Sequence, residues 1–161
     1  FGAPPMIFNA GLTGEVDGVI NFWHFMAKMK AQGMREVISV ADAATALGLD
    51  PAIPLLGYVV SEDLLTSDPE LVAGLKKASR AAKDRLLADD AAWDRLRPMM
   101  NADNDAEFAA LRAGWRAGVP VDAPVNEANA AKVFALMAEL GGEELLGKVT
   151  VLPEGVFYKG E

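Results

Sequence analysis

The sequence predicts an α/β domain in which a mostly parallel β-sheet is flanked by helices. Within the first 60 residues, short runs of β-branched and aromatic residues alternate with segments of helical spacing, which is typical of strand–helix units. The chain has 161 residues and 52% of them are hydrophobic, which is enough for a buried core. We expect residues 1–60 to form part of an α/β lobe. Residues 61–161 should form a helix-rich part that returns to that lobe.

The first half of the chain carries the predicted strands. Pro4–Leu12 should be a short helix, because proline is well suited to the first turn of a helix. Val16–Phe22 is rich in β-branched residues and predicts a strand, and Trp23–Gln32 then has apolar residues at helical spacing. Arg35–Val40 and Leu55–Val60 predict two more short strands.

Helices dominate the second half. Ser67–Glu70 combines an N-cap residue, a proline for the first turn and a Glu placed for a capping box, so we expect a helix over Pro69–Leu87. Three further helical segments follow at Asp90–Met100, Asp103–Ala117 and Asn126–Leu140. Phe108, Leu111 and Trp115 share one face of the third of these four segments.

Composition excludes several classes of function. The net charge of −8 disfavours binding to nucleic acid or to an anionic membrane surface, since both need many lysines and arginines. We therefore expect no nucleic-acid partner. The chain has no cysteine, which excludes disulfides, thiolate metal sites and a cysteine nucleophile and fits either the cytoplasm or the periplasm.

The sequence also lacks the motifs of common enzyme classes. Phosphate-binding glycine loops, the nucleophile elbow and the HExxH zinc motif do not occur. The single histidine, His24, has no clustered carboxylates and predicts no metal site. Asp103–Asp105 lacks the Gly and Glu that a calcium loop requires, and Asp89, Asp90 and other acidic residues are interpreted as helix caps. We therefore expect neither a catalytic centre nor a cofactor.

Two regions resemble a known family. Leu12–Val19, which reads LTGEVDGV, resembles the acidic turn and strand of the nitrate/sulfonate/taurine type of periplasmic solute-binding proteins, which are similar in fold to the thiamine-precursor group. Gly57–Asp63, followed by the DPELV helix from Asp68 to Lys83, resembles that family's return strand and helix. In this resemblance the chain corresponds to the C-terminal half of such a protein.

The resemblance implies a lobe of the type II periplasmic-binding-protein fold, incomplete relative to the two-lobed family. It implies the extracytoplasmic solute-binding component of an ABC importer, which captures a small anionic organic solute such as a sulfonate or a nitrate-like compound. The implied partners are the membrane permease of the importer and an N-terminal lobe of the same protein that would precede Phe1. The implied location is the periplasm, with the signal peptide outside this chain.

The best candidate ligand contacts lie where the first predicted strand turns into a helix. At such a position backbone N–H groups and the helix dipole favour an anion. Asn21 offers a donor and an acceptor, Trp23 offers a stacking surface, and His24 offers a hydrogen bond. Alternatively, Trp23 packs in the core and His24 is a solvated residue at the helix start.

Weaker candidates lie elsewhere. Gly2, Ala3 and Pro4 could form a small-residue turn that lets the backbone approach a ligand, although an ordinary turn explains them equally well. Tyr58 on the third predicted strand could line the cleft, or could be packed with its hydroxyl satisfied.

Two other functions remain open from the sequence. An effector-binding domain of a transcription regulator would share the bilobed architecture. An enzyme similar to thiamine-pyrimidine synthase would need a cysteine-rich motif, and the absence of cysteine disfavours it.

Overall fold

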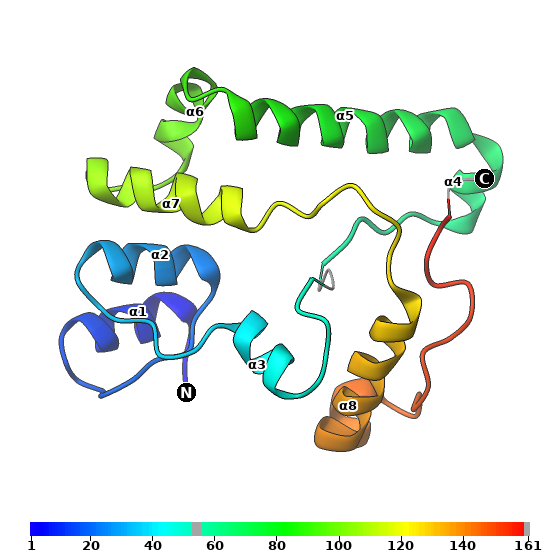
Figure 1. Cartoon of the computed structure of the whole chain (residues 1–161), viewed down its shortest axis with the longest axis horizontal. Helices are drawn as coiled ribbons and strands as arrows, with labels where there is room; N and C mark the ends of the chain where they lie inside the picture. Colours follow the sequence, from blue (N-terminus) through cyan, green and yellow to red (C-terminus); the bar gives the residue numbers. More distant parts are fainter. Residues whose placement is uncertain (53–55, 160–161) are drawn as a thin grey trace. The chain divides into compact units, whose positions relative to one another are not determined.

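The computed structural model describes residues 1–52 and 56–159, and within these ranges all regular secondary structure is helical (Figure 1). The helices are, in chain order, α1 (Pro4–Leu12), α2 (Trp23–Ala31), α3 (Val40–Ala46), α4 (Glu62–Ser67), α5 (Pro69–Ala88), α6 (Ala91–Leu96), the 3-10 turn η1 (Arg97–Met99), α7 (Asp105–Ala117) and α8 (Glu127–Leu146). None of the helices in the described ranges is both long and apolar enough to span a membrane.

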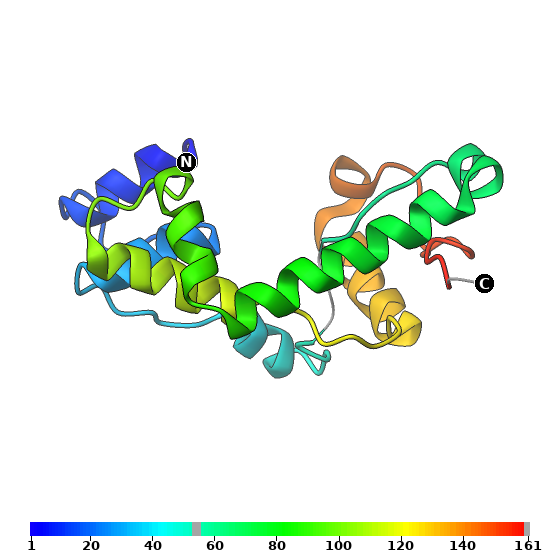
Figure 2. The same ribbon diagram turned by 90° about the horizontal axis from the view of Figure 1, so that it is seen from above.

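The chain divides into two compact units. Unit 1 contains Phe1–Val37 and Gly74–Val119, and unit 2 contains Ile38–Ala73 and Pro120–Glu161. Helix α5 contributes residues to both units, and Figure 2 shows it as one unbroken helix. Each unit is described separately below.

The core of unit 1 lies between α2 and α7, which pack side by side (Figure 1). Met29 of α2 is fully buried, and Trp93 of α6 and Phe108 and Leu111 of α7 are almost completely buried. Helix α1 packs on the other side of α2, where the rings of Phe8 and Phe25 lie 5.4 Å apart. The apolar spacing of the sequence therefore sets which faces of α2 and α7 meet.

Helix starts are fixed by short local signals. The side-chain oxygen of Asn104 accepts a hydrogen bond from the backbone N–H of Glu107, which caps α7. Ser39 and Asp42 form a reciprocal capping box at α3. Asn126 caps α8 through the N–H of Asn129, and the helical backbone is interrupted at Gly142, which has a φ of 55°.

Unit 2 is held by a buried asparagine. Asn129 of α8 is 6% exposed. Its side-chain oxygen accepts the backbone N–H of Asp50 at 3.0 Å, and its amide nitrogen donates to the carbonyl of the same residue at 3.2 Å. These two hydrogen bonds join the segment after α3 to α8, because the N–H and the carbonyl of Asp50 both bond to the side chain of Asn129. We call this pair of bonds the clamp.

The prediction of an α/β fold is wrong. Val16–Phe22 consists of turns and irregular backbone, Arg35–Ser39 is irregular, and Val40 begins α3 instead of ending a strand. In the third predicted strand Leu55 lies outside the described residues, and 56–60 is not a strand. A strand exists only where a neighbouring chain supplies a ladder of hydrogen bonds, and β-branched residues favour it by packing on a half-buried sheet. Here Ile20 and Val59 are 94% and 95% exposed.

The helical predictions hold better. The predicted helices at Pro4–Leu12 and Trp23–Gln32 match α1 and α2, and those at Pro69–Leu87 and Asp103–Ala117 match α5 and α7 within a few residues. The helix predicted to end at Leu140 continues as α8 to Leu146, and Asp90–Met100 divides into α6 and η1. Helices α3 and α4 have no counterpart among the predicted helices. At the start of α5 the cap is Asp68, whose carboxylate accepts the N–H of Leu71, and the preceding Ser67 ends α4.

Candidate ligand-binding pocket

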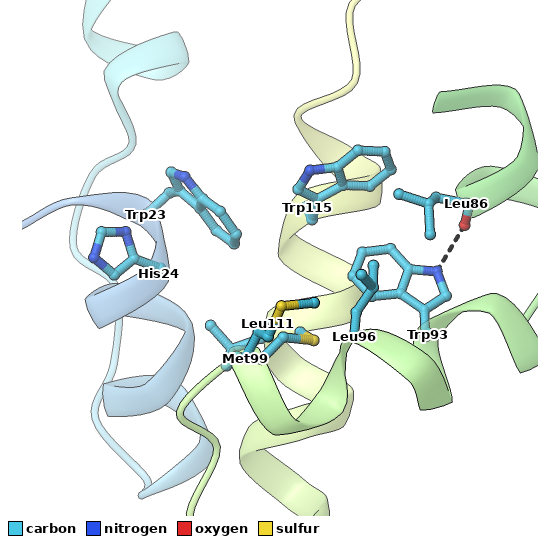
Figure 3. Close-up of a pocket in the computed structure, with 9 residues that line it drawn as sticks. Trp23, His24, Leu86, Trp93, Leu96, Met99, Leu111 and Trp115 are labelled. Carbon is cyan, nitrogen blue, oxygen red and sulfur yellow. Dashed lines mark hydrogen bonds between the residues drawn. The ribbon is translucent and has the colours of Figure 1, made fainter. Parts of the chain in front are cut away.

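Unit 1 contains an aromatic pocket of about 320 Å³ (Figure 3). This volume lies at the lower end of the range for small-molecule sites. Three tryptophans, one histidine and five aliphatic or thioether side chains line it: Trp23, His24, Leu86, Trp93, Leu96, Met99, Met100, Leu111 and Trp115. Apolar walls with few polar groups are typical of sites that bind organic molecules.

Two helices hold the facing walls of the pocket. Trp23 is the first residue of α2, and Trp115 lies in the last turn of α7. Figure 3 shows these two indole rings on opposite sides of the pocket. Trp23 lies against α7 at Gly114, where a Cβ would be 3.4 Å from the Trp23 ring, an ordinary van der Waals contact. Trp23 is 51% exposed and stands at the rim.

The back wall is rigid. The Trp93 ring is 3% exposed and meets the Trp115 ring edge-on, with centroids 5.2 Å apart. Its indole N–H donates to the backbone carbonyl of Leu86 at 2.8 Å, which is the dashed line in Figure 3. Arg116 donates to the same carbonyl at 3.0 Å. The last turn of α5 is thus fastened to both α6 and α7.

The polar groups of the side chains that line this pocket are the indole nitrogens of the three tryptophans and the imidazole of His24. The indole nitrogens of Trp23 and Trp115 have no acceptor among the described residues, whereas that of Trp93 is occupied. Among the described residues that line the pocket, His24 is the one with a titratable side chain. Its ring lies 5.6 Å from that of Trp23 and 4.6 Å from that of Phe25, measured between centroids.

Positive charge lies behind the pocket. The Arg116 guanidinium is 5.8 Å from the centroid of the Trp93 ring. Arg116 and Arg112 both pair with Asp90, at 2.6 Å and 3.2 Å. The hydrogen bond from Arg116, followed by the charges of both arginines, holds the pKa of Asp90 below its ordinary value although desolvation opposes this. Two guanidiniums therefore share one carboxylate.

Comparison with known proteins does not assign this pocket. No protein-family model matches the chain, and no curated protein sequence matches it significantly. A function must therefore be argued from the side chains themselves. Across the described residues, no group of three or more His, Asp or Glu side chains is placed to hold a metal ion.

The structure brings together two of the seven residues predicted as ligand contacts. Trp23 and His24 both line the pocket. Asn21 does not, because its amide nitrogen donates to the carbonyl of Pro4 at 2.9 Å and its oxygen accepts the N–H of Phe22. Asn21 therefore joins the start of α2 to the start of α1, which is a structural role.

The remaining predicted contacts lie away from the pocket lining. Ala3 is the N-cap of α1, and its carbonyl accepts the N–H groups of Met6 and Ile7. Gly2 and Pro4 flank it and belong to the same ordinary helix start. Tyr58 belongs to unit 2 and is 70% exposed.

Sequence reasoning missed most of the pocket. Trp93 and Trp115 lie 22 positions apart in the chain, and nothing in either local sequence shows that α6 and α7 bring them into contact. A partial signal existed, because Phe108, Leu111 and Trp115 recur at helical spacing. Met99 and Met100 gave no signal, since the helical segment predicted over Asp90–Met100 does not show which side chains they meet.

A buried carboxylate sets the spacing between α2 and α7. Glu107 is 1% exposed, and its two oxygens accept from the amide of Gln32 at 3.0 Å and the N–H of Asp103 at 3.1 Å. The ammonium of Lys28 lies 3.3 Å from one of them. Burial alone would raise the pKa of Glu107, but these hydrogen bonds and the Lys28 charge together hold it below its ordinary value. The pair of helices that carries Trp23 and Trp115 is locked by this network.

Proposed function

We propose that this chain captures a small organic solute without transforming it, as the solute-binding component of an extracytoplasmic ABC importer. The observation that carries the proposal is the aromatic pocket of unit 1, in which three indole rings and apolar side chains surround about 320 Å³. Among the described residues its lining offers no nucleophile paired with a base, which favours capture over catalysis.

The importer role is supported by the segments Leu12–Val19 and Gly57–Lys83, which resemble solute-binding proteins. The fold expected from that resemblance is wrong, so the pocket supports solute binding and the resemblance supports the transport context. A periplasmic location and a membrane permease as partner belong to the same proposal.

Calorimetric titration with a panel of small organic solutes tests the binding function. The panel contains taurine, aliphatic sulfonates, aromatic acids and neutral aromatic compounds. The Leu86→Phe substitution adds volume to a pocket wall, so it should abolish saturable binding. Leu87→Phe is the matched control, because Leu87 is the next residue of α5, is 40% exposed and does not line the pocket.

Circular dichroism must show that both variants remain folded. The proposal requires that at least one solute bind with a 1:1 stoichiometry, and that Leu87→Phe retain this binding while Leu86→Phe loses it. Equal binding by the two variants would place the solute elsewhere, and a panel without any saturable binding would refute the proposed function.

A further inference from the structure

We propose that the pocket of unit 1 selects flat aromatic acids, that is arylcarboxylates or arylsulfonates of one or two rings. This inference rests on the solute-binding function proposed above and narrows it to one chemical class. Three independent features of the pocket lead to it: the shape of the walls, the kind of polar group that the lining side chains carry, and the sign of the charge beside the Trp93 wall.

The walls favour a flat ring system. Trp23 and Trp115 present indole rings from opposite sides of the pocket, and Trp93 forms the back (Figure 3). Aromatic rings gain from stacked or edge-on contacts with other rings beyond the area they bury. The volume of about 320 Å³ is roughly twice the ~150 Å³ of an apolar cavity that holds benzene. A ligand of two fused rings therefore fits, and the thioethers of Met99 and Met100 can adapt to its edge.

The polar groups favour a ligand that accepts hydrogen bonds. An indole nitrogen donates and cannot accept. The N–H groups of Trp23 and Trp115 lack an acceptor within the described ranges, and a ligand that excludes water from them must supply one. Carboxylate and sulfonate oxygens do so, whereas an ammonium group offers only donors.

The charge behind the pocket favours an anion. Arg112 and Arg116 share the carboxylate of Asp90, so these three side chains together carry net positive charge, and Arg116 lies beside the Trp93 wall. Arg116 already lies 5.8 Å from the Trp93 ring centroid, where a cationic ligand would otherwise gain a cation–π contact. Trp23 and His24 are also the first two residues of α2, and the N-terminal end of a helix carries partial positive charge. The acidic net charge of the chain acts at longer range and is screened by salt.

Titration with three matched naphthalene compounds tests the inference. They are 1-naphthoate, 1-naphthalenemethanol and 1-naphthylmethylamine, which carry an anionic, a neutral and a cationic group on the same ring. We expect the acid to bind about tenfold more tightly than the alcohol, because hydrogen bonds to charged groups are the stronger ones. The amine should bind least tightly.

Phenylalanine substitutions identify the donors. Trp23→Phe and Trp115→Phe retain an aromatic ring and remove one N–H each, so each should reduce the preference for the acid over the alcohol by about threefold or more. Leu87→Phe is the control, because Leu87 is 40% exposed and does not line the pocket. It should leave the preference unchanged. The ratio of two affinities within one variant does not depend on the fraction of folded protein.

The two proposals fail in different ways. If the alcohol or the amine binds as tightly as the acid and Leu86→Phe abolishes binding of all three, solute binding stands and selection of aromatic acids is wrong. The same conclusion follows if aliphatic sulfonates bind in the pocket more tightly than 1-naphthoate. If no compound binds, or if Leu86→Phe changes nothing, the solute-binding function itself is wrong and the inference falls with it.

Discussion

Replacing Glu107 with glutamine perturbs the contact between α2 and α7 and therefore the distance between the pocket walls. Glutamine has nearly the same shape but carries no charge and retains only one acceptor oxygen. The bonds from Gln32, Asp103 and Lys28 then change from charge-assisted to neutral, or are lost. Hydrogen bonds to charged groups contribute about 1.5–3 kcal/mol and neutral ones about 1 kcal/mol. Removing the charge also lowers the cost of burying this side chain, which offsets part of that loss. We therefore expect a net decrease of about 2 kcal/mol in the free energy of unfolding.

Urea unfolding followed by tryptophan fluorescence measures this loss. The chain has three tryptophans, Trp23, Trp93 and Trp115, and all belong to unit 1, so the signal reports on that unit. Glu36→Gln is the matched control. The Glu36–Lys30 ion pair has exposed side chains, and such pairs contribute about 0–1 kcal/mol.

The effect should depend on pH with a defined sign. The pKa of Glu107 in the folded state lies below its ordinary value of 4.5. A depressed pKa stabilises the fold above the pKa of the unfolded state, and this stabilisation is lost as pH falls through the folded value. The difference between wild type and Glu107→Gln should therefore be present at pH 7 and shrink below pH 4.5. A difference that is constant down to pH 3, or a loss at pH 7 no greater than that of Glu36→Gln, would refute the reasoning.

Three further substitutions have expected outcomes. Gly74→Ala should raise the free energy of unfolding by about 0.5–1 kcal/mol, because a Cβ there meets no atom within 4 Å in the α5 helix; a destabilised variant in thermal unfolding would contradict this. Asn129→Ala should cost unit 2 about 1–3 kcal/mol by leaving both backbone groups of Asp50 without their partner, and unchanged hydrogen exchange at the Asp50 amide would show that the clamp is unimportant. Ser39→Ala should lower the stability of α3 by about 1 kcal/mol, because it removes the cap on the N–H of Asp42. Hydrogen exchange should then become faster only at the amides of that helix.

Local signals in the sequence predicted the helices well. The start of α1 depends on its prolines, and the start of α8 depends on the cap provided by Asn126. Both signals involve only a few neighbouring residues, and the structure confirms both helix starts. The predicted strands failed for a different reason. Val16–Phe22 and 56–60 have strand-forming composition, but strand formation depends on a partner that the sequence of the segment does not specify.

The candidate pocket was predictable only where it depends on local sequence. Trp23 and His24 lie at the start of a helix that the local sequence predicts, and this position alone makes them candidate ligand contacts. Trp93 became part of the site because its N–H reaches the carbonyl of Leu86 and its ring meets Trp115. These contacts depend on how α5, α6 and α7 pack, and helical spacing alone does not fix the choice of neighbour.

The most direct test of the pocket is NMR of the three indole N–H groups during titration with 1-naphthoate. Each signal is assigned by its loss in the corresponding tryptophan-to-phenylalanine variant. We predict saturable shifts of the Trp23 and Trp115 signals with a common dissociation constant, and a smaller shift of the Trp93 signal, since that N–H already donates to the Leu86 carbonyl. Three unperturbed indole signals at saturating 1-naphthoate, or shifts confined to backbone amides of unit 2, would contradict the assignment of the aromatic pocket as the binding site.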